Sequence, residues 1–195
     1  MTESLSAELV VPRLRGRFGR PYLYVEVCPS TQRLLSAEQS EGAVAVTEEQ
    51  TEGRGRLGRN WLSPHGVSIL CSVLLEPPVD TQRLPELSLA AGEAVAEAIA
   101  SVTGLEPAIK LPNDILLGDR KAAGILAEAR GGRVVLGIGI NVNVPPEDLP
   151  TEVDRPATSL LVETGAEVDR AELLVELLAA LERRYDKWVR SVTGG

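Results

Sequence analysis

The segment from Gly53 to Trp61, Gly-Arg-Gly-Arg-Leu-Gly-Arg-Asn-Trp, combines three glycines with three arginines and ends on a tryptophan. Arginine carries a fixed charge on a planar fork that pairs with carboxylates and phosphates, and glycine lets a backbone lie against a ligand. The segment cannot bury itself or hold a regular element. A Gly/Arg cluster taken alone is more often a solvated basic turn. Two later stretches favour the other interpretation, a mobile loop that binds an anion.

These later stretches are Lys110-Leu-Pro-Asn-Asp114 with Asp119-Arg-Lys-Ala-Ala-Gly-Ile-Leu126, and Gly137-Ile-Gly-Ile-Asn141. They add cations and flexible backbone to the first segment. Activating a carboxylic acid on a phosphate needs no general base, because the acid is already ionised at pH 7. It needs groups that hold two anions together and stabilise charge on the phosphoryl oxygens. The motifs supply five such cations: Arg54, Arg56, Arg59, Lys110 and Lys121.

Other catalytic chemistries have little support in the sequence. His65 is the only histidine, so a Ser-His-Asp triad has one candidate base, and no motif surrounds it. A nucleophilic pair of Cys71 with His65 lacks a third, orienting group. The two cysteines, Cys28 and Cys71, show no metal or redox spacing, which indicates two buried, reduced thiols.

The 195 residues are enough for one domain with a substantial core. The net charge of −8 argues against a general binder of nucleic acid or of an anionic membrane. No apolar run is long enough to span a membrane, and the N-terminus lacks the apolar core of a signal peptide. We therefore expect a cytoplasmic protein that binds neither membranes nor nucleic acid.

The hydrophobic pattern predicts a series of strands with few helices between them. The predicted strands are 22–28, 43–47, 67–75, 108–110, 114–117, 122–130 and 133–143, with a hairpin turn at 131–132. A helix is predicted over 31–39, with Ser30 as a plausible N-cap or ligand contact. A second helix is predicted over 84–102, with a stop at Gly104. A third begins at Asp169, which has capping-box spacing to Glu172. A core stripe follows on the last helix: Leu174, Leu177, Leu178, Leu181, Tyr185 and Trp188.

This order predicts an α+β fold with a mixed, mostly antiparallel sheet and helices packed on one face. Residues 1–195 are expected to form a single catalytic domain, and 1–20 an irregular N-terminal segment. Four arginines in that segment give a basic patch that we interpret as a solvated face: Arg13, Arg15, Arg17 and Arg20.

Taken together, the motifs resemble those of the biotin–protein ligases. The resemblance covers roughly residues 22–145 and includes Ser30-Thr31, Gln50, and the three stretches quoted above. It implies a fold like that of biotin ligases and class II aminoacyl-tRNA synthetases. It also implies that biotin is activated with Mg-ATP as biotinyl-5′-AMP and passed to one lysine of a biotin carboxyl carrier domain, usually in acetyl-CoA carboxylase. ATP with Mg²⁺ and biotin are then substrates, and no permanently bound cofactor is expected.

The resemblance also assigns roles to residues. Catalytic roles fall on Lys121, Arg56 and Asp114, with Lys121 between the biotin carboxylate and the α-phosphate. The residues expected to bind biotin are Ser30, Thr31, Gln50, Gly53, Arg54, Arg56, Lys121, Gly124, Gly137 and Gly139. The residues expected to bind the nucleotide are Arg54, Arg56, Arg59, Trp61, Lys110, Asn113, Lys121 and Asn141. Asn113 and Asp114 are candidates to hold Mg²⁺ through water, and Asp114 alternatively orients the incoming lysine.

Three departures from the family pattern stand out. Pro29 and Gln32 flank Ser-Thr where the family commonly has Asp and Asn, and Leu111 replaces a usual tryptophan. The sequence also offers no winged helix, so DNA binding is not implied. We likewise find no stretch that corresponds to the small C-terminal β domain that members usually carry. A lipoate or octanoate ligase or transferase of the same fold remains an alternative, as does a non-catalytic biotin sensor. Homodimerisation is left open.

Overall fold

The structure is a computed structural model that describes residues 4–36, 38–151 and 155–194. Its centre is one seven-stranded sheet with the order β1-β2-β3-β7-β6-β5-β4. The strands are β1 Tyr22–Cys28, β2 Val44–Gln50, β3 Ser68–Leu75, β4 Ala108–Lys110, β5 Asp114–Leu117, β6 Arg120–Arg130 and β7 Arg133–Asn141. Only β1 and β2 pair in parallel, and every other pair is antiparallel. The predicted mixed, mostly antiparallel sheet is confirmed.

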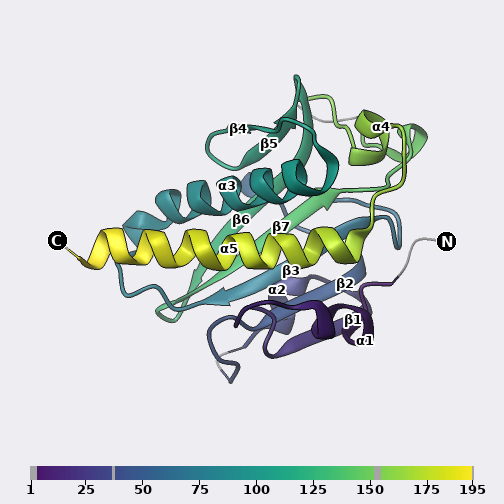
Figure 1. The fold of residues 1–195 in the computed structure, drawn as a ribbon. Coiled ribbons are helices and arrows are strands. Elements are labelled where there is room, and N and C mark those ends of the chain that lie inside the picture. Colours follow the sequence, from purple (N-terminus) through teal and green to yellow (C-terminus); the bar gives the residue numbers. More distant parts are fainter. Residues whose placement is uncertain (1–3, 37, 152–154, 195) are drawn as a thin grey trace.

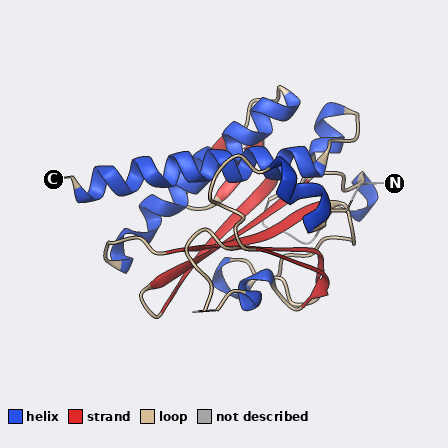
Figure 2. Cartoon of the chain, turned by 60° about the horizontal axis from the view of Figure 1, so that its bottom comes forward, coloured by secondary structure: helices blue, strands red, loops and turns tan. Residues whose placement is uncertain are grey.

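Two long helices, α3 (Leu84–Thr103) and α5 (Arg170–Thr193), lie side by side across one face of the sheet (Figure 1). Figure 2 shows these two layers from another side, with the long helices above the strands. The short helices are α1 Ala7–Val10, α2 Thr31–Leu34 and α4 Leu160–Thr164, and the 3-10 turns are η1 Val11–Arg13, η2 Arg56–Gly58, η3 Thr81–Arg83 and η4 Pro146–Asp148. No helix in the described ranges is long and apolar enough to cross a membrane.

Local sequence accounts for the ends of the long helices. The carboxylate of Asp169 accepts a hydrogen bond from the Glu172 amide at 2.9 Å, which caps the first turn of α5 as predicted. Gly104 ends α3 in the left-handed conformation, and its N–H donates to the Ala100 carbonyl. The predicted α5 stripe is buried along its whole length, so it is core as expected.

Three strands, β1, β4 and β5, have the predicted bounds, and the predicted hairpin turn at 131–132 is confirmed. Gly131 and Gly132 both have positive φ, 57° and 81°, and join β6 to β7 as a tight hairpin. Two boundaries differ in ways that affect the site. β2 continues to Gln50 rather than ending at Thr47, and the helix after Ser30 ends at Leu34 rather than near Gln39.

The N-terminal segment is more ordered than predicted. It contains α1 and η1, and Leu5, Val10 and Phe18 are buried in the main core. Its arginines are partly engaged with α5 rather than forming a purely solvated face: Arg13 pairs with Asp169, Arg15 with Glu176, and Arg17 with Glu182 and Asp186. The helical elements of this segment span only three or four residues each, which is too short for a periodicity signal in the sequence.

The sheet face opposite α3 and α5 has its own small apolar cluster. α2 lies there, where Leu34 and Leu35 pack with Ala43, Ala45 and Val135. Most helical mass is on one face as predicted, but this short helix covers part of the other face and leaves the rest of it for the site described below.

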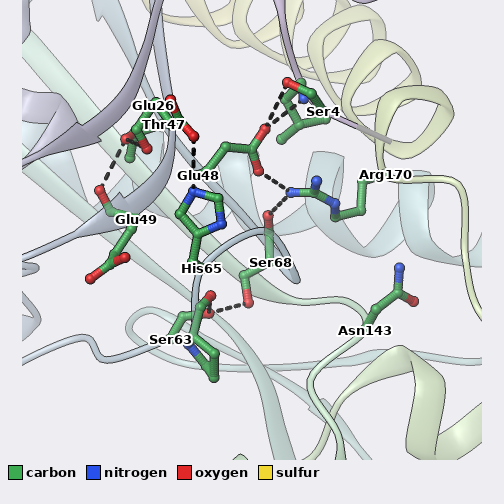
Figure 3. Close-up of polar contacts among 12 residues, drawn as sticks. Ser4, Glu26, Thr47, Glu48, Glu49, Ser63, His65, Ser68, Asn143 and Arg170 are labelled. Carbon is green, nitrogen blue, oxygen red and sulfur yellow. Dashed lines mark hydrogen bonds and ion pairs between the residues drawn. The ribbon is translucent and has the colours of Figure 1, made fainter. Parts of the chain in front are cut away.

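A buried ion pair joins the sheet to α5 and to the N-terminal segment (Figure 3). Nη1 of Arg170 lies 2.7 Å from Oε2 of Glu48, and both side chains are at most 3% exposed. The guanidinium also donates to the Ser68 carbonyl, and the other carboxylate oxygen accepts the Leu5 amide at 2.7 Å. These bonds satisfy both charges where water is excluded, which a buried pair requires.

Removing one member of this pair should destabilise the fold strongly. Arg170→Met leaves the Glu48 carboxylate buried without its cation, and such losses cost about 3–5 kcal/mol. Arg13→Met, at the half-exposed pair with Asp169, is the matched control and should cost about 0–1 kcal/mol. Urea unfolding followed by circular dichroism measures both. Equal midpoints for the two variants would contradict a structural role for the buried pair.

Candidate functional site

The parallel pairing of β1 with β2 brings two polar segments to the same edge of the sheet. Cys28 is in register with Gln50, so the residues that follow β1 lie beside the end of β2. Oε1 of Gln50 accepts the Thr31 amide at 2.9 Å and the Thr31 hydroxyl at 3.2 Å, and that hydroxyl also lies 2.7 Å from the Ser72 hydroxyl. Ser30 occupies the predicted N-cap position, but its side chain makes no capping hydrogen bond and instead lines the cavity.

Next to this polar end, three glycines in β6 and β7 leave one face of the sheet free of side chains. Gly137 pairs with Leu126 of β6 and Ser72 of β3, and Gly139 pairs with Gly124 of β6. We call Gly124, Gly137 and Gly139 the glycine strip. Other side chains lie directly on it: a Cβ added to Gly139 would be 2.5 Å from Cε2 of Trp61, and one added to Gly137 would be 2.8 Å from Nε2 of Gln32. Any side chain on the strip would displace them.

The Gly/Arg segment carries Trp61 onto the strip by closing into a small hairpin. Arg54 and Asn60 form a bridge, and the Trp61 amide donates to the Gly53 carbonyl at 2.9 Å. The segment therefore holds local structure that its composition did not predict. At its tip, Leu57 has a φ of 59°, a costly value for a residue with a Cβ, and is 86% exposed. Gly53 sits at the base, where a Cβ would collide with the Trp61 carbonyl.

Lys121 is held at both its backbone and the tip of its side chain. Its Nζ lies 2.7 Å from Oδ1 of Asp114 and 5.6 Å from the centre of the Trp61 ring. Its amide donates to the Pro156 carbonyl at 2.8 Å, and its carbonyl accepts the Thr158 amide at 2.9 Å. The backbone is thus held on both sides and the side chain at its tip, so little reorganisation is needed when an anion arrives.

These groups surround one cavity of about 1030 Å³. Among its described lining residues, the cations are Arg54, Arg56, Arg59, Lys110, Lys121 and Arg155. The same lining holds a single carboxylate, that of Asp114. Because the whole chain has a net charge of −8, this concentration of positive charge is local, and it favours an anionic ligand.

The structure brings together almost all of the residues that the sequence singled out. The cavity lining includes Ser30, Thr31, Gln50, Arg54, Arg56, Arg59, Trp61, Lys110, Asn113, Asp114, Lys121, Gly124, Gly137, Gly139 and Asn141. Gly53 lies instead in the lining of a smaller adjoining pocket. Asn141 is 5% exposed and its Nδ2 donates to the Thr158 carbonyl at 3.0 Å, so part of its amide positions the segment beside Lys121.

Several lining residues were not assigned to the site from the sequence, among them the polar residues Gln32, Ser72 and Arg155. Ser72 had a signal, because a serine inside the apolar run of β3 marks a polar spot on one face. Gln32 was noted only as a departure from a family pattern. Arg155 follows a proline-rich stretch with no periodicity, and only the tertiary fold brings it to the cavity.

Metal and nucleophile chemistry have weak support here. Within the described parts of the chain, no three His, Cys, Asp or Glu side chains gather as a metal site. Asn113 and Asp114 offer only one amide oxygen and one carboxylate, a set that suits a cation arriving with a phosphate ligand. Burial raises the pKa of the Cys71 thiol to about 12, and the His65 imidazole lies 3.7 Å from Glu26, so both observations argue against a Cys–His nucleophile.

Comparisons with known proteins agree with this geometry. The sequence model described as the Biotin/lipoate A/B protein ligase family matches residues 24–144. A curated relative from Bacillus subtilis, named bifunctional ligase/repressor BirA, is 39% identical over 176 residues, covering 86% of this chain and 54% of its own. The biotin--[acetyl-CoA-carboxylase] ligase of Mycobacterium tuberculosis is 43% identical over 162 residues, covering 80% and 59%.

A solved structure extends the comparison to three dimensions. The biotin protein ligase from Aquifex aeolicus in complex with biotin and ATP superposes with a TM-score of 0.78 at 36% identity. The match covers 85% of this chain and 70% of that one. The chain spans about half the length of the curated relatives that it matches.

The close contact between Trp61 and the glycine strip can be tested directly. Gly139→Ala puts a methyl group where the indole lies, so Trp61 should move toward solvent. In a Trp188→Phe background, which leaves Trp61 as the sole tryptophan, we expect red-shifted emission and easier acrylamide quenching. Gly92→Ala is the matched control, because its Cβ would be 3.4 Å from the nearest atom, an ordinary contact. Unchanged emission in Gly139→Ala would show that the indole does not cover the strip.

Proposed function

We propose, from the premise that the chain belongs to the biotin/lipoate A/B protein ligase family, that it is an ATP-dependent biotin–protein ligase. It activates biotin as biotinyl-5′-AMP and transfers biotin to a lysine of a biotin carboxyl carrier domain. The observation that carries the proposal is the cavity that joins a hydrogen-bonding end at Thr31 and Gln50 to a cluster of six cations around Lys121.

The first step joins two anions. A carboxylate oxygen of biotin attacks the α-phosphorus of ATP, an acyl-phosphate bond forms, and pyrophosphate leaves. No base is needed, because the acid is already ionised. Lys121 is assigned the position between carboxylate and α-phosphate, where its fixed charge lowers the repulsion and stabilises the transition state. Arg56 is assigned to the phosphate, with Arg54 and Arg59 beside it.

The second step is attack by an amine. The neutral lysine amine of the carrier attacks the acyl carbonyl, an amide forms, and AMP leaves. That amine has an ordinary pKa of about 10.4 and must lose a proton before it attacks. Asp114, whose Oδ1 is engaged by Lys121, has a second oxygen with which to orient the incoming ammonium or to reach Mg²⁺ through water.

The two ends of the cavity suit the two parts of the intermediate. Ser30, Thr31 and Gln50 are assigned to the polar ureido ring, and the glycine strip leaves room for the apolar remainder of biotin. Trp61 and Asn141 are assigned to the adenine, by stacking and by contact with its edge. Lys110 and Asn113 are assigned to the phosphates, and Mg²⁺ enters with the nucleotide as part of the substrate.

A lipoate or octanoate ligase of the same family and a non-catalytic biotin sensor are the competing functions. The polar end of the cavity favours biotin over lipoate, since an alkyl or dithiolane end offers few hydrogen-bonding groups. The preorganised Lys121 favours an enzyme over a sensor, because binding alone does not require a cation between the two anions.

The proposal is tested by incubating the protein with biotin, Mg-ATP and a carrier domain and then measuring the mass of the carrier by mass spectrometry. We expect a gain of one biotin. Lys121→Met keeps the side-chain stem but removes the charge, and should slow adenylate formation by about 10²–10³-fold in a single-turnover assay. An unmodified carrier together with no hydroxylamine-trapped biotin would overturn the enzyme proposal, and a parent-like rate in Lys121→Met would overturn the role of that lysine.

The Gly/Arg segment is proposed to close over the adenylate and protect it from water and stray amines. Arg56→Gly should weaken that closure, so the adenylate escapes and labels unrelated proteins. Mixed with biotin, Mg-ATP and serum albumin, the variant should biotinylate albumin faster than the parent, and increasingly so at higher pH as lysines deprotonate. Lys187→Gly, on α5 and outside the cavity lining, controls for loss of a surface cation. Albumin labelling no faster than with the parent, while adenylate still forms, would exclude the lid.

A further inference from the structure

Gln32 holds a buried hydrogen-bond acceptor that no described group satisfies. The side chain is 4% exposed and lines the cavity. Its Nε2 donates to the Leu126 carbonyl at 3.1 Å, whereas its Oε1 is buried without a hydrogen-bond partner. Turning the amide over would set Oε1 against the Leu126 carbonyl, two acceptors facing each other, so the orientation is decided by the hydrogen bond.

The whole residue is held in place around this oxygen. Nη1 of Arg130 donates to the main-chain carbonyl of Gln32 at 2.8 Å, and the side chain lies on Gly137, which has no side chain to displace it. An unsatisfied buried carbonyl is unfavourable, and native proteins retain few of them. A fixed acceptor that lines a ligand cavity is instead suited to a donor carried by the ligand.

The other amide side chain at this end of the cavity, that of Gln50, cannot replace Gln32 as an acceptor. Oε1 of Gln50 already accepts two hydrogen bonds, from the Thr31 amide and the Thr31 hydroxyl. An amide oxygen has two lone pairs, so this oxygen is saturated, and the group that Gln50 has left for a ligand is its NH₂, a donor. Gln50 thus suits a ligand carbonyl, and Gln32 suits a ligand N–H.

We propose that Gln32 is a specificity-determining residue that accepts an N–H of a cyclic urea. This inference rests on the proposed function and deepens it. A cyclic urea carries one carbonyl and two N–H groups, which match the donor of Gln50 and the acceptor of Gln32. A dithiolane or alkyl end carries no N–H and leaves Oε1 unpaired. Sites that hydrogen-bond a substrate discriminate strongly against analogues that lack the group, so Gln32 separates the biotin and lipoate chemistries of the family.

The test compares ligands with and without the cyclic urea on matched variants. Gln32→Met has nearly the same length and no acceptor, and Gln32→Leu serves as a second variant if Met does not fold. Gln82→Met, on an exposed glutamine outside the cavity lining, is the control. Calorimetry with biotin, desthiobiotin and octanoate measures affinity, since desthiobiotin keeps the urea without the sulfur ring.

We expect the Gln32 variants to bind biotin and desthiobiotin about 10–100-fold more weakly than the parent and to bind octanoate at least as well. The control should match the parent for all three. Equal losses for all ligands would show a structural role and overturn the inference, as would unchanged affinity for biotin. If the parent itself binds octanoate but not biotin, the proposed function fails first, so the two failures are distinguishable.

Discussion

A bare strip of backbone in the middle of the sheet is the constraint on which the site depends. Gly124, Gly137 and Gly139 put no side chains on one face, so neighbouring segments must cover that face themselves. Trp61, at the end of the Gly/Arg hairpin, and Gln32, on α2, both lie on this strip, and each is closer to the glycine backbone than a Cβ atom would permit. The cavity is bounded by these two side chains and the surrounding strands, and the missing Cβ atoms of the strip let both side chains approach the backbone of the sheet.

The lining of the cavity has the opposite charge balance to the chain as a whole. The chain is acidic overall, yet the described lining of the cavity carries six cations and one carboxylate. Asp114 engages Lys121 and so orders it, while the backbone of Lys121 is held by Pro156 and Thr158. An ordered cation in a positive cavity is suited to binding a ligand with more than one negative charge, as a carboxylate and a phosphate together would be.

The far face of the sheet keeps this arrangement rigid. There α3 and α5 bury the core, and the Glu48–Arg170 ion pair joins β2, β3 and α5 with the N-terminal segment. The Ser63 hydroxyl donates to the Ser68 hydroxyl at 2.7 Å, so the chain leaving the Gly/Arg hairpin is fixed to the strand whose carbonyl Arg170 contacts. Core and site therefore share strands β2 and β3, with opposite faces serving each.

The sequence alone was enough to predict the turn between β6 and β7 and the α5 stripe, because these depend on Gly131–Gly132 and on local periodicity. Nearly all the residues that it proposed for the site do line the cavity, because their chemistry is recognisable within short motifs. It did not predict the packing of residues 4–20, the hairpin that places Trp61 on the glycine strip, or the position of Arg155 at the cavity. Nor did it show that Gln32 keeps an unpaired oxygen. Those features arise from contacts between segments distant in sequence, where register and burial decide which polar atoms meet, and no local pattern encodes that.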